Sequence, residues 1–195
     1  MFARAILFST LMLICSGAAF AQRPGPQFWR KLACEPLEPR TQLEAFELRH
    51  SAVIIKGFTR ITTIELRGMR IDAVEMRQPG TTFSAKGVVI VLREGGERPN
   101  ENRAFVDYAE IEPLLNAIDA LARVDETTTK LPGFEARYIT EGDLEISVFR
   151  QTRSGTAVTM TTGICDQATV TLTLDELARF KAMIQEAKTR LDEIR

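Results

Sequence analysis

Few residues of this 195-residue chain have the types and spacing that catalysis requires. His50 is the single histidine, so a Ser-His-Asp or Cys-His arrangement must use it, and a metal site has no second imidazole. Its neighbour Ser51 does not supply a nucleophile, because adjacent residues of a strand point to opposite faces. No G-x-S-x-G, H-E-x-x-H, P-loop or G-x-G-x-x-G motif is present. We therefore expect no catalytic, cofactor-binding or metal-ligating residue.

Paired carboxylates are the one enzyme chemistry that the sequence leaves open. Asp125 precedes Glu126, and Glu141 lies two residues before Asp143. Two acids can hydrolyse a glycosidic bond when they flank it. Acids in turns and linkers are, however, ordinary turn formers and helix neighbours. A carboxylate-based hydrolase stays an alternative to a protein without enzymatic activity.

Residues 1–21 have the three parts of a cleavable secretory signal peptide. Arg4 is followed by an apolar run and then by the triplet Ala19-Phe20-Ala21, a cleavage signal of small residues. The run is short for a membrane-spanning helix, and Ile14 is too large to precede a lipid-modified cysteine at Cys15. We expect an exported protein, periplasmic or secreted, with no transmembrane segment after cleavage.

The mature chain has a net charge near −2 and two cysteines, Cys34 and Cys165. A near-neutral chain is a poor partner for nucleic acid, which binds clustered Lys and Arg. An even number of cysteines in an oxidising compartment favours a disulfide between Cys34 and Cys165, and two unpaired thiols are the alternative. Neither cysteine lies in a C-x-x-C motif, so nothing points to redox catalysis.

Residues 22–41 are rich in proline and predict an extended arm, and residues 42–195 predict a single α+β domain with antiparallel strands. Arg67-Gly68 predicts a hairpin turn between two strands. Residues 111–121 and 177–191 carry apolar stripes at helical spacing. The predicted strands are residues 62–66, 69–77, 86–94 and 103–108 in the first half and 134–140, 144–150, 156–160 and 168–174 in the second.

The two halves end alike, which predicts a tandem (ββββα)2 arrangement in two layers, with two amphipathic helices and pseudo-repeats at about 42–125 and 126–195. A shift of 66 residues places Asp107 on Thr173 and Glu110 on Glu176, and both pairs match a helix capping box. Pro113 conflicts with the first box, because it lies too far inside a helix that begins there. Convergence of two common strand–helix junctions is the alternative to a true repeat.

The mixed charges Arg70, Asp72, Glu75 and Arg77 on one predicted strand indicate cross-strand ion pairs rather than a charged docking surface. Residues 43–58, 105–121 and 173–188 resemble a group of exported bacterial proteins of unknown function. The order of four strands and a helix, written twice, resembles the Whirly-type topology. The best-known Whirly-type proteins bind single-stranded nucleic acid, but this chain lacks the basic, aromatic-lined sheet that such binding needs.

The sequence thus favours an exported, non-enzymatic protein that binds an unknown protein or envelope component through its sheet surface. Its oligomeric state stays open. A carboxylate-based hydrolase and a carrier of a small ligand or lipid are the alternatives, and a carrier requires an apolar cavity between helices and sheet.

Overall fold

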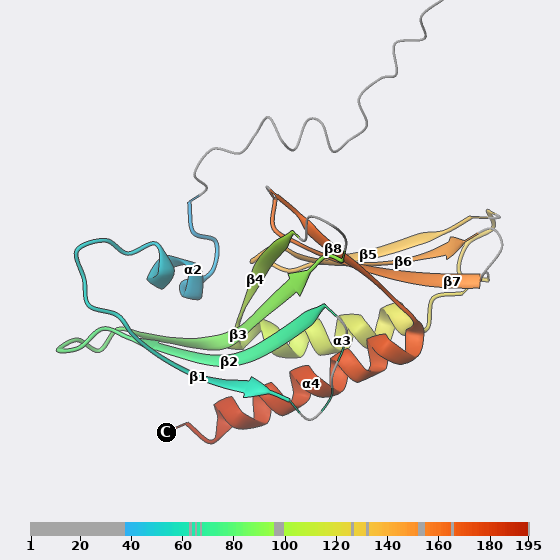
Figure 1. The fold of residues 1–195 in the computed structure, drawn as a ribbon. Coiled ribbons are helices and arrows are strands. Elements are labelled where there is room, and N and C mark those ends of the chain that lie inside the picture. The colour runs from blue at the N-terminus through green and yellow to red at the C-terminus, as the bar shows by residue number, and fades with distance from the viewer. Residues whose placement is uncertain are drawn as a thin grey trace, which may run out of the picture.

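The described part of the chain contains two four-stranded antiparallel sheets, each followed by a helix (Figure 1). The structure is a computed structural model, and it describes residues 38–194 except 63, 65, 67, 96–99, 126, 132, 152–154 and 165. The strand orders are β1-β2-β3-β4 and β5-β6-β7-β8, so each sheet is a simple meander. The predicted α+β class and the (ββββα)2 arrangement are confirmed.

Each unit contains four strands and one long helix, and a short helix precedes the first unit. The short helix is α2 (Gln42–Glu47). The first unit consists of β1 (Ile55–Ile61), β2 (Met69–Arg77), β3 (Ser84–Arg93), β4 (Glu101–Asp107), the 3-10 turn η1 (Tyr108–Glu110) and α3 (Ile111–Ala122). The second unit consists of β5 (Glu135–Ile139), β6 (Leu144–Gln151), β7 (Gly155–Thr162), β8 (Ala168–Leu172) and α4 (Leu174–Asp192).

One sequence prediction at the start of the first unit is wrong: the first strand is β1 rather than residues 62–66. The helix α2, with which the domain begins, was not predicted from the sequence. Thr41 and Glu44 form a capping box there, with Glu44 N–H donating to Thr41 Oγ1 over 3.1 Å. A six-residue helix is too short for a visible apolar period.

The capping box predicted for α4 is confirmed, and the one predicted for α3 is wrong. Glu176 N–H donates to Thr173 Oγ1 over 3.2 Å, and Thr173 N–H donates to Glu176 Oε2 over 2.8 Å. Asp107 caps no amide of η1, and α3 begins only at Ile111. Pro113 therefore lies in the first turn of α3, where the backbone amide has no helical acceptor to lose.

The helices pack mainly on the sheet of the other unit. Helix α4 lies against β1, β2 and β3 as well as β7 and β8, whereas α3 lies against β5, β6 and α4 (Figure 1). One apolar cluster therefore takes residues from both sheets and both helices, among them Ile90, Leu114, Ile146 and Phe180, all with no exposed surface. Neither unit can bury its own sheet without the helix of its neighbour.

The first sheet is also covered on its opposite face, by α2. Leu43 and Phe46 of α2 pack on Val89 and Phe105 in a second apolar cluster. Both central strands of this sheet are consequently buried along most of their length, in contrast to β1. The strand β1 lies at the border of the sheet (Figure 1).

Lys86 and Tyr108 of the first unit bind the end of α4. Lys86 Nζ donates to the carbonyl oxygen of Leu191 over 2.9 Å and lies 4.4 Å from the centroid of the Tyr108 ring. The Tyr108 hydroxyl donates to the carboxylate of Asp192. A lysine at a helix C-terminus satisfies a free carbonyl and opposes the negative end of the helix dipole.

Several sequence predictions concern residues outside the described ranges. They are the signal peptide at 1–21, most of the arm at 22–41, and the cysteines Cys34 and Cys165. Within the part of the chain that the structure describes, no helix combines the length and the apolar character needed to cross a membrane.

Candidate functional site

A cleft of about 720 Å³ lies where η1 and β3 of the first unit meet the β5–β6 turn of the second. Carboxylates and tyrosines make up half of its lining residues, so the cleft suits a polar ligand better than an apolar one. The polar side chains that line it are Gln42, Glu75, Ser84, Lys86, Asp107, Tyr108, Glu110, Tyr138 and Glu141.

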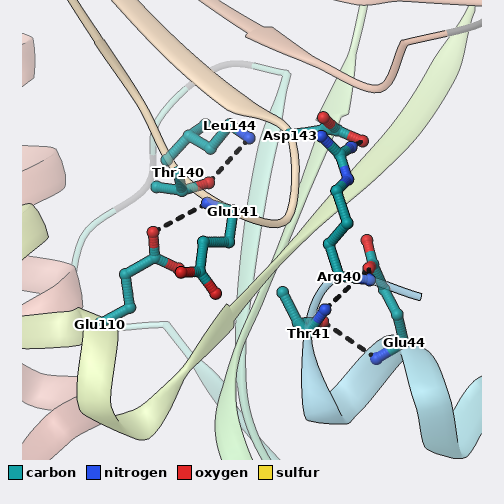
Figure 2. Close-up of polar contacts among 8 residues, drawn as sticks. All are labelled: Arg40, Thr41, Glu44, Glu110, Thr140, Glu141, Asp143 and Leu144. Carbon is teal, nitrogen blue, oxygen red and sulfur yellow. Dashed lines mark hydrogen bonds and ion pairs between the residues drawn. The ribbon is translucent and has the colours of Figure 1, made fainter. Parts of the chain in front are cut away.

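The β5–β6 turn, residues 140–144, forms one wall of the cleft and bonds to the first unit. Phe105 N–H donates to the carbonyl oxygen of Gly142 over 3.1 Å, an antiparallel bridge between β4 and the turn. A Cβ atom at Gly142 would overlap the carbonyl oxygen of Phe105, so the approach requires glycine. Thr140 Oγ1 accepts from Leu144 N–H over 3.0 Å, which closes the turn (Figure 2).

Glu110 reaches the same turn from the end of η1 (Figure 2). Its Oε1 accepts from the backbone amide of Glu141 over 2.8 Å, and its Oε2 is buried without a hydrogen-bond partner among the described residues. Burial raises the pKa of Glu110 above its ordinary value. The amide of Glu141 opposes that shift, and the charges of Glu141 and Asp107 add to it.

Tyr138 belongs to the same group of titratable side chains. Burial raises the pKa of its hydroxyl, and the negative charges of Glu110 and Glu141 raise it further. A carboxyl with a raised pKa beside a tyrosine is a combination found in proton-transfer sites, and also in buried structural contacts.

Two acids hold the segment at residues 40–43 against the site: Asp107 binds backbone amides and Asp143 pairs with Arg40. The Asp107 carboxylate accepts from Gln42 N–H over 2.7 Å and from Leu43 N–H over 3.2 Å, so Asp107 caps α2 instead of α3. The Arg40 guanidinium pairs with Asp143, which has a positive φ of 67° (Figure 2). Asparagine and aspartate tolerate this backbone region better than most residues.

Of the described acids considered as pairs from the sequence, only Glu141 lines the cleft. The charge of Glu141 acts on Glu110 of the other unit, whereas Asp143 pairs with Arg40. Asp125 lies in an exposed turn, where it accepts from Thr127 N–H over 2.8 Å, and Glu126 lies outside the described residues. His50 is exposed in the segment between α2 and β1 and does not line the cleft.

Sequence reasoning considered Glu110 only as a capping residue and missed it as part of the cleft. Its contact with Glu141 spans 31 residues, and no local pattern marks a contact of that range. Among the described residues no group of His, Cys, Asp and Glu side chains has the arrangement to hold a metal ion.

Comparison of the chain with protein-family models, curated proteins and solved structures finds no match.

Two acids of the cleft bind the backbone of other segments. Asp107 and Glu110 each accept bonds from backbone amides of another segment, α2 in one case and the β5–β6 turn in the other. Each carboxylate therefore connects the end of β4 or η1 to a segment distant in the sequence. We name the bonds among Arg40, Phe105, Glu110 and residues 140–144 the turn clamp.

We predict that Glu110→Gln stabilises the protein at pH 7. The raised pKa of Glu110 means that its ionised form costs folding free energy, and this cost is absent below the ordinary pKa of glutamate. The amide oxygen of glutamine can still accept from Glu141. Because solvent screens the half-buried site, we expect a gain below about 1 kcal/mol.

Urea unfolding of the variant and the wild type at several pH values measures this gain. The difference in unfolding free energy should shrink as the pH falls through the raised pKa of Glu110. The exposed Glu135→Gln serves as the control and should change little at any pH. A loss of stability in Glu110→Gln at pH 7 would show that the charged bond is favourable after all.

Proposed function

We propose that this is an exported, non-enzymatic binding protein that contacts an envelope partner through the β1 border of its first sheet. The observation that carries the proposal is the exposure of β1. Six of its seven residues are exposed, including Phe58 with 63% of its surface accessible, whereas β2 and β3 are mostly buried. An exposed aromatic residue on a free strand is a typical anchor for a protein partner.

Further aromatic and basic side chains lie on the α2-covered face of the same sheet. Phe83 is 55% exposed at the β2–β3 turn and packs on Phe46, with ring centroids 5.7 Å apart. The Arg49 guanidinium lies 4.5 Å from the centroid of the Phe83 ring. Arg49 and Phe83 lie on the same face as the outward side chains of β1 and β2. We name this set of side chains the β1 surface; it consists of Arg49, Lys56, Phe58, Arg60, Arg70 and Phe83.

The two alternative functions have less support. A hydrolase needs two acids that face each other across a substrate, and both carboxylate oxygens of Asp107 and the Oε1 atom of Glu110 bind backbone amides. A carrier needs an apolar cavity, and the more apolar groove beside Ile61, Met69 and Met183 is an open surface groove with Arg60 and Arg70 among its lining residues.

We predict that a photo-crosslinking amino acid at Phe58 captures an envelope protein in intact cells. The same amino acid at Leu131, which is 73% exposed in the segment after α3, is the matched control. Phe58 should give a discrete crosslinked product, and Leu131 should not. Equal products from both positions, or none from Phe58 while known envelope complexes are captured, would contradict the proposal.

Export also bears on the proposed disulfide between Cys34 and Cys165. The described neighbours of both cysteines meet at Asp143. Its carboxylate pairs with Arg40, six residues after Cys34, and its carbonyl oxygen accepts from Gly163 N–H over 3.2 Å, two residues before Cys165. Described residues near each cysteine therefore contact the same residue, which supports the proposed pairing.

We predict that a non-reducing peptide map of the mature protein from the periplasm or medium contains a fragment linking Cys34 with Cys165. Reduction should lower the free energy of unfolding, by up to about 4 kcal/mol in the chain-entropy model. The Cys34→Ser variant should be insensitive to reductant. Recovery of both cysteines as free thiols would overturn the disulfide.

A further inference from the structure

We infer that the partner of the β1 surface is an extended acidic segment of a protein, which adds to the first sheet as a strand beside β1. The inference rests on the proposed function and names the chemistry of its partner. It follows from the backbone at the sheet border, the charges around β1 and the spacing of its side chains.

The border offers an unbroken row of backbone groups. Residues Ile55–Ile61 pair with Ile71–Arg77 in continuous antiparallel register, without a bulge and without proline. In a strand with one neighbour, alternate N–H and C=O groups point away from that neighbour and can bond a second strand. No other described strand pairs with this border of the sheet.

The ion pairs around β1 leave positive charge in excess. Asp72 is shared by two arginines, with its carboxylate oxygens 3.2 Å from Arg60 Nε and 3.2 Å from Arg70 Nε. Glu47 is likewise shared, at 2.6 Å from Lys56 Nζ and 3.5 Å from Arg103 Nη2. Each group of two cations and one carboxylate therefore has a net charge of +1.

This local excess differs from the chain as a whole, whose net charge is −1. Arg49 adds a further positive charge, since its guanidinium donates to Gln78 Oε1 and lies over the rings of Phe46 and Phe83.

The sequence predicted cross-strand ion pairs for the mixed charges of β2, and Asp72 pairs with Arg60 on the neighbouring strand β1. Arg70, on the same strand as Asp72, shares that carboxylate. What the sequence pattern could not show is that Lys56 of β1 and Arg103 of β4 meet at Glu47 of α2.

The side chains of β1 match a strand of alternating character. Lys56, Phe58 and Arg60 are two residues apart and share one face of the sheet. An added strand would place carboxylates beside Lys56 and Arg60 and an apolar side chain beside Phe58. On the other face, Gly57 and Thr59 border a groove of about 380 Å³ that is also lined by Ala73, Glu75, Arg190, Glu193 and Ile194. A Cβ atom at Gly57 would touch only one backbone oxygen at 4.0 Å, so this groove has room for a small apolar side chain.

The test uses the mature protein and a fluorescent, end-blocked peptide as long as β1. The peptide carries glutamate, isoleucine and glutamate on one face of an extended chain and threonine or valine on the other. A second peptide replaces both glutamates with lysine. We expect fluorescence anisotropy to show binding of the acidic peptide alone, with an affinity that falls as salt is added.

Matched charge reversals locate the peptide. Lys56→Glu and Arg60→Glu should each weaken binding about tenfold or more, and the exposed Lys130→Glu, in the segment after α3, should not. Circular dichroism checks that each variant is folded. Hydrogen exchange separates strand addition from contact between side chains alone, because only strand addition slows exchange of the outward amides of residues 55–61 in the complex.

Three results would overturn the inference: equal binding of both peptides, unchanged binding in both β1 variants, or unprotected β1 amides in the complex. Tighter binding of a single-stranded oligonucleotide at the same residues would also overturn it, in favour of a nucleic acid. If Phe58 still crosslinks to an envelope protein in cells, the proposed function stands and only the strand-addition chemistry falls. If that crosslink fails as well, both fall.

Discussion

The close approach of Gly142 to Phe105 is the constraint on which the arrangement of the two units depends. It brings the β5–β6 turn against β4 at a distance that only glycine permits. Glu110 and Arg40 then bind the same turn from two further segments. The exchanged packing of α3 and α4 supplies the apolar burial, and the turn clamp sets how the sheets meet. With the interior and the α2 face covered in this way, β1 is left as an open border of the first sheet.

The regular parts of the fold could be predicted from the sequence because they depend on local period. The strand β2 was predicted with its observed bounds, and the capping box at Thr173 and Glu176 is the one that forms. The box at Asp107 failed because the carboxylate is taken by the amides of α2, more than sixty residues earlier in the chain. That competition between two helix starts is a tertiary contact, and a pattern of spacing contains no information about it.

The candidate sites were less predictable for the same physical reason. The sequence drew attention to Glu141 and Asp143 as turn acids, but the raised pKa of Glu110 depends on burial and on neighbours across the unit boundary. The charges of β2 suggested cross-strand ion pairs, and Asp72 does pair with Arg60 of β1. The sequence did not indicate that Glu47 of α2 pairs with Lys56 and Arg103. Exposure of β1 could not be inferred either, since its residues Ile55, Phe58 and Ile61 would suit a buried strand equally well.

The most direct test of the account is the free energy of unfolding of Gly142→Ala, measured with urea beside the wild type. Gly133→Ala is the matched control, because a Cβ atom at Gly133 meets nothing within 4 Å. If the turn clamp holds the units together, Gly142→Ala should lose about 3 kcal/mol, as overpacking against backbone does, and the control should lose almost nothing. Equal stabilities for the two variants would contradict the account, because the turn would then tolerate a position away from Phe105.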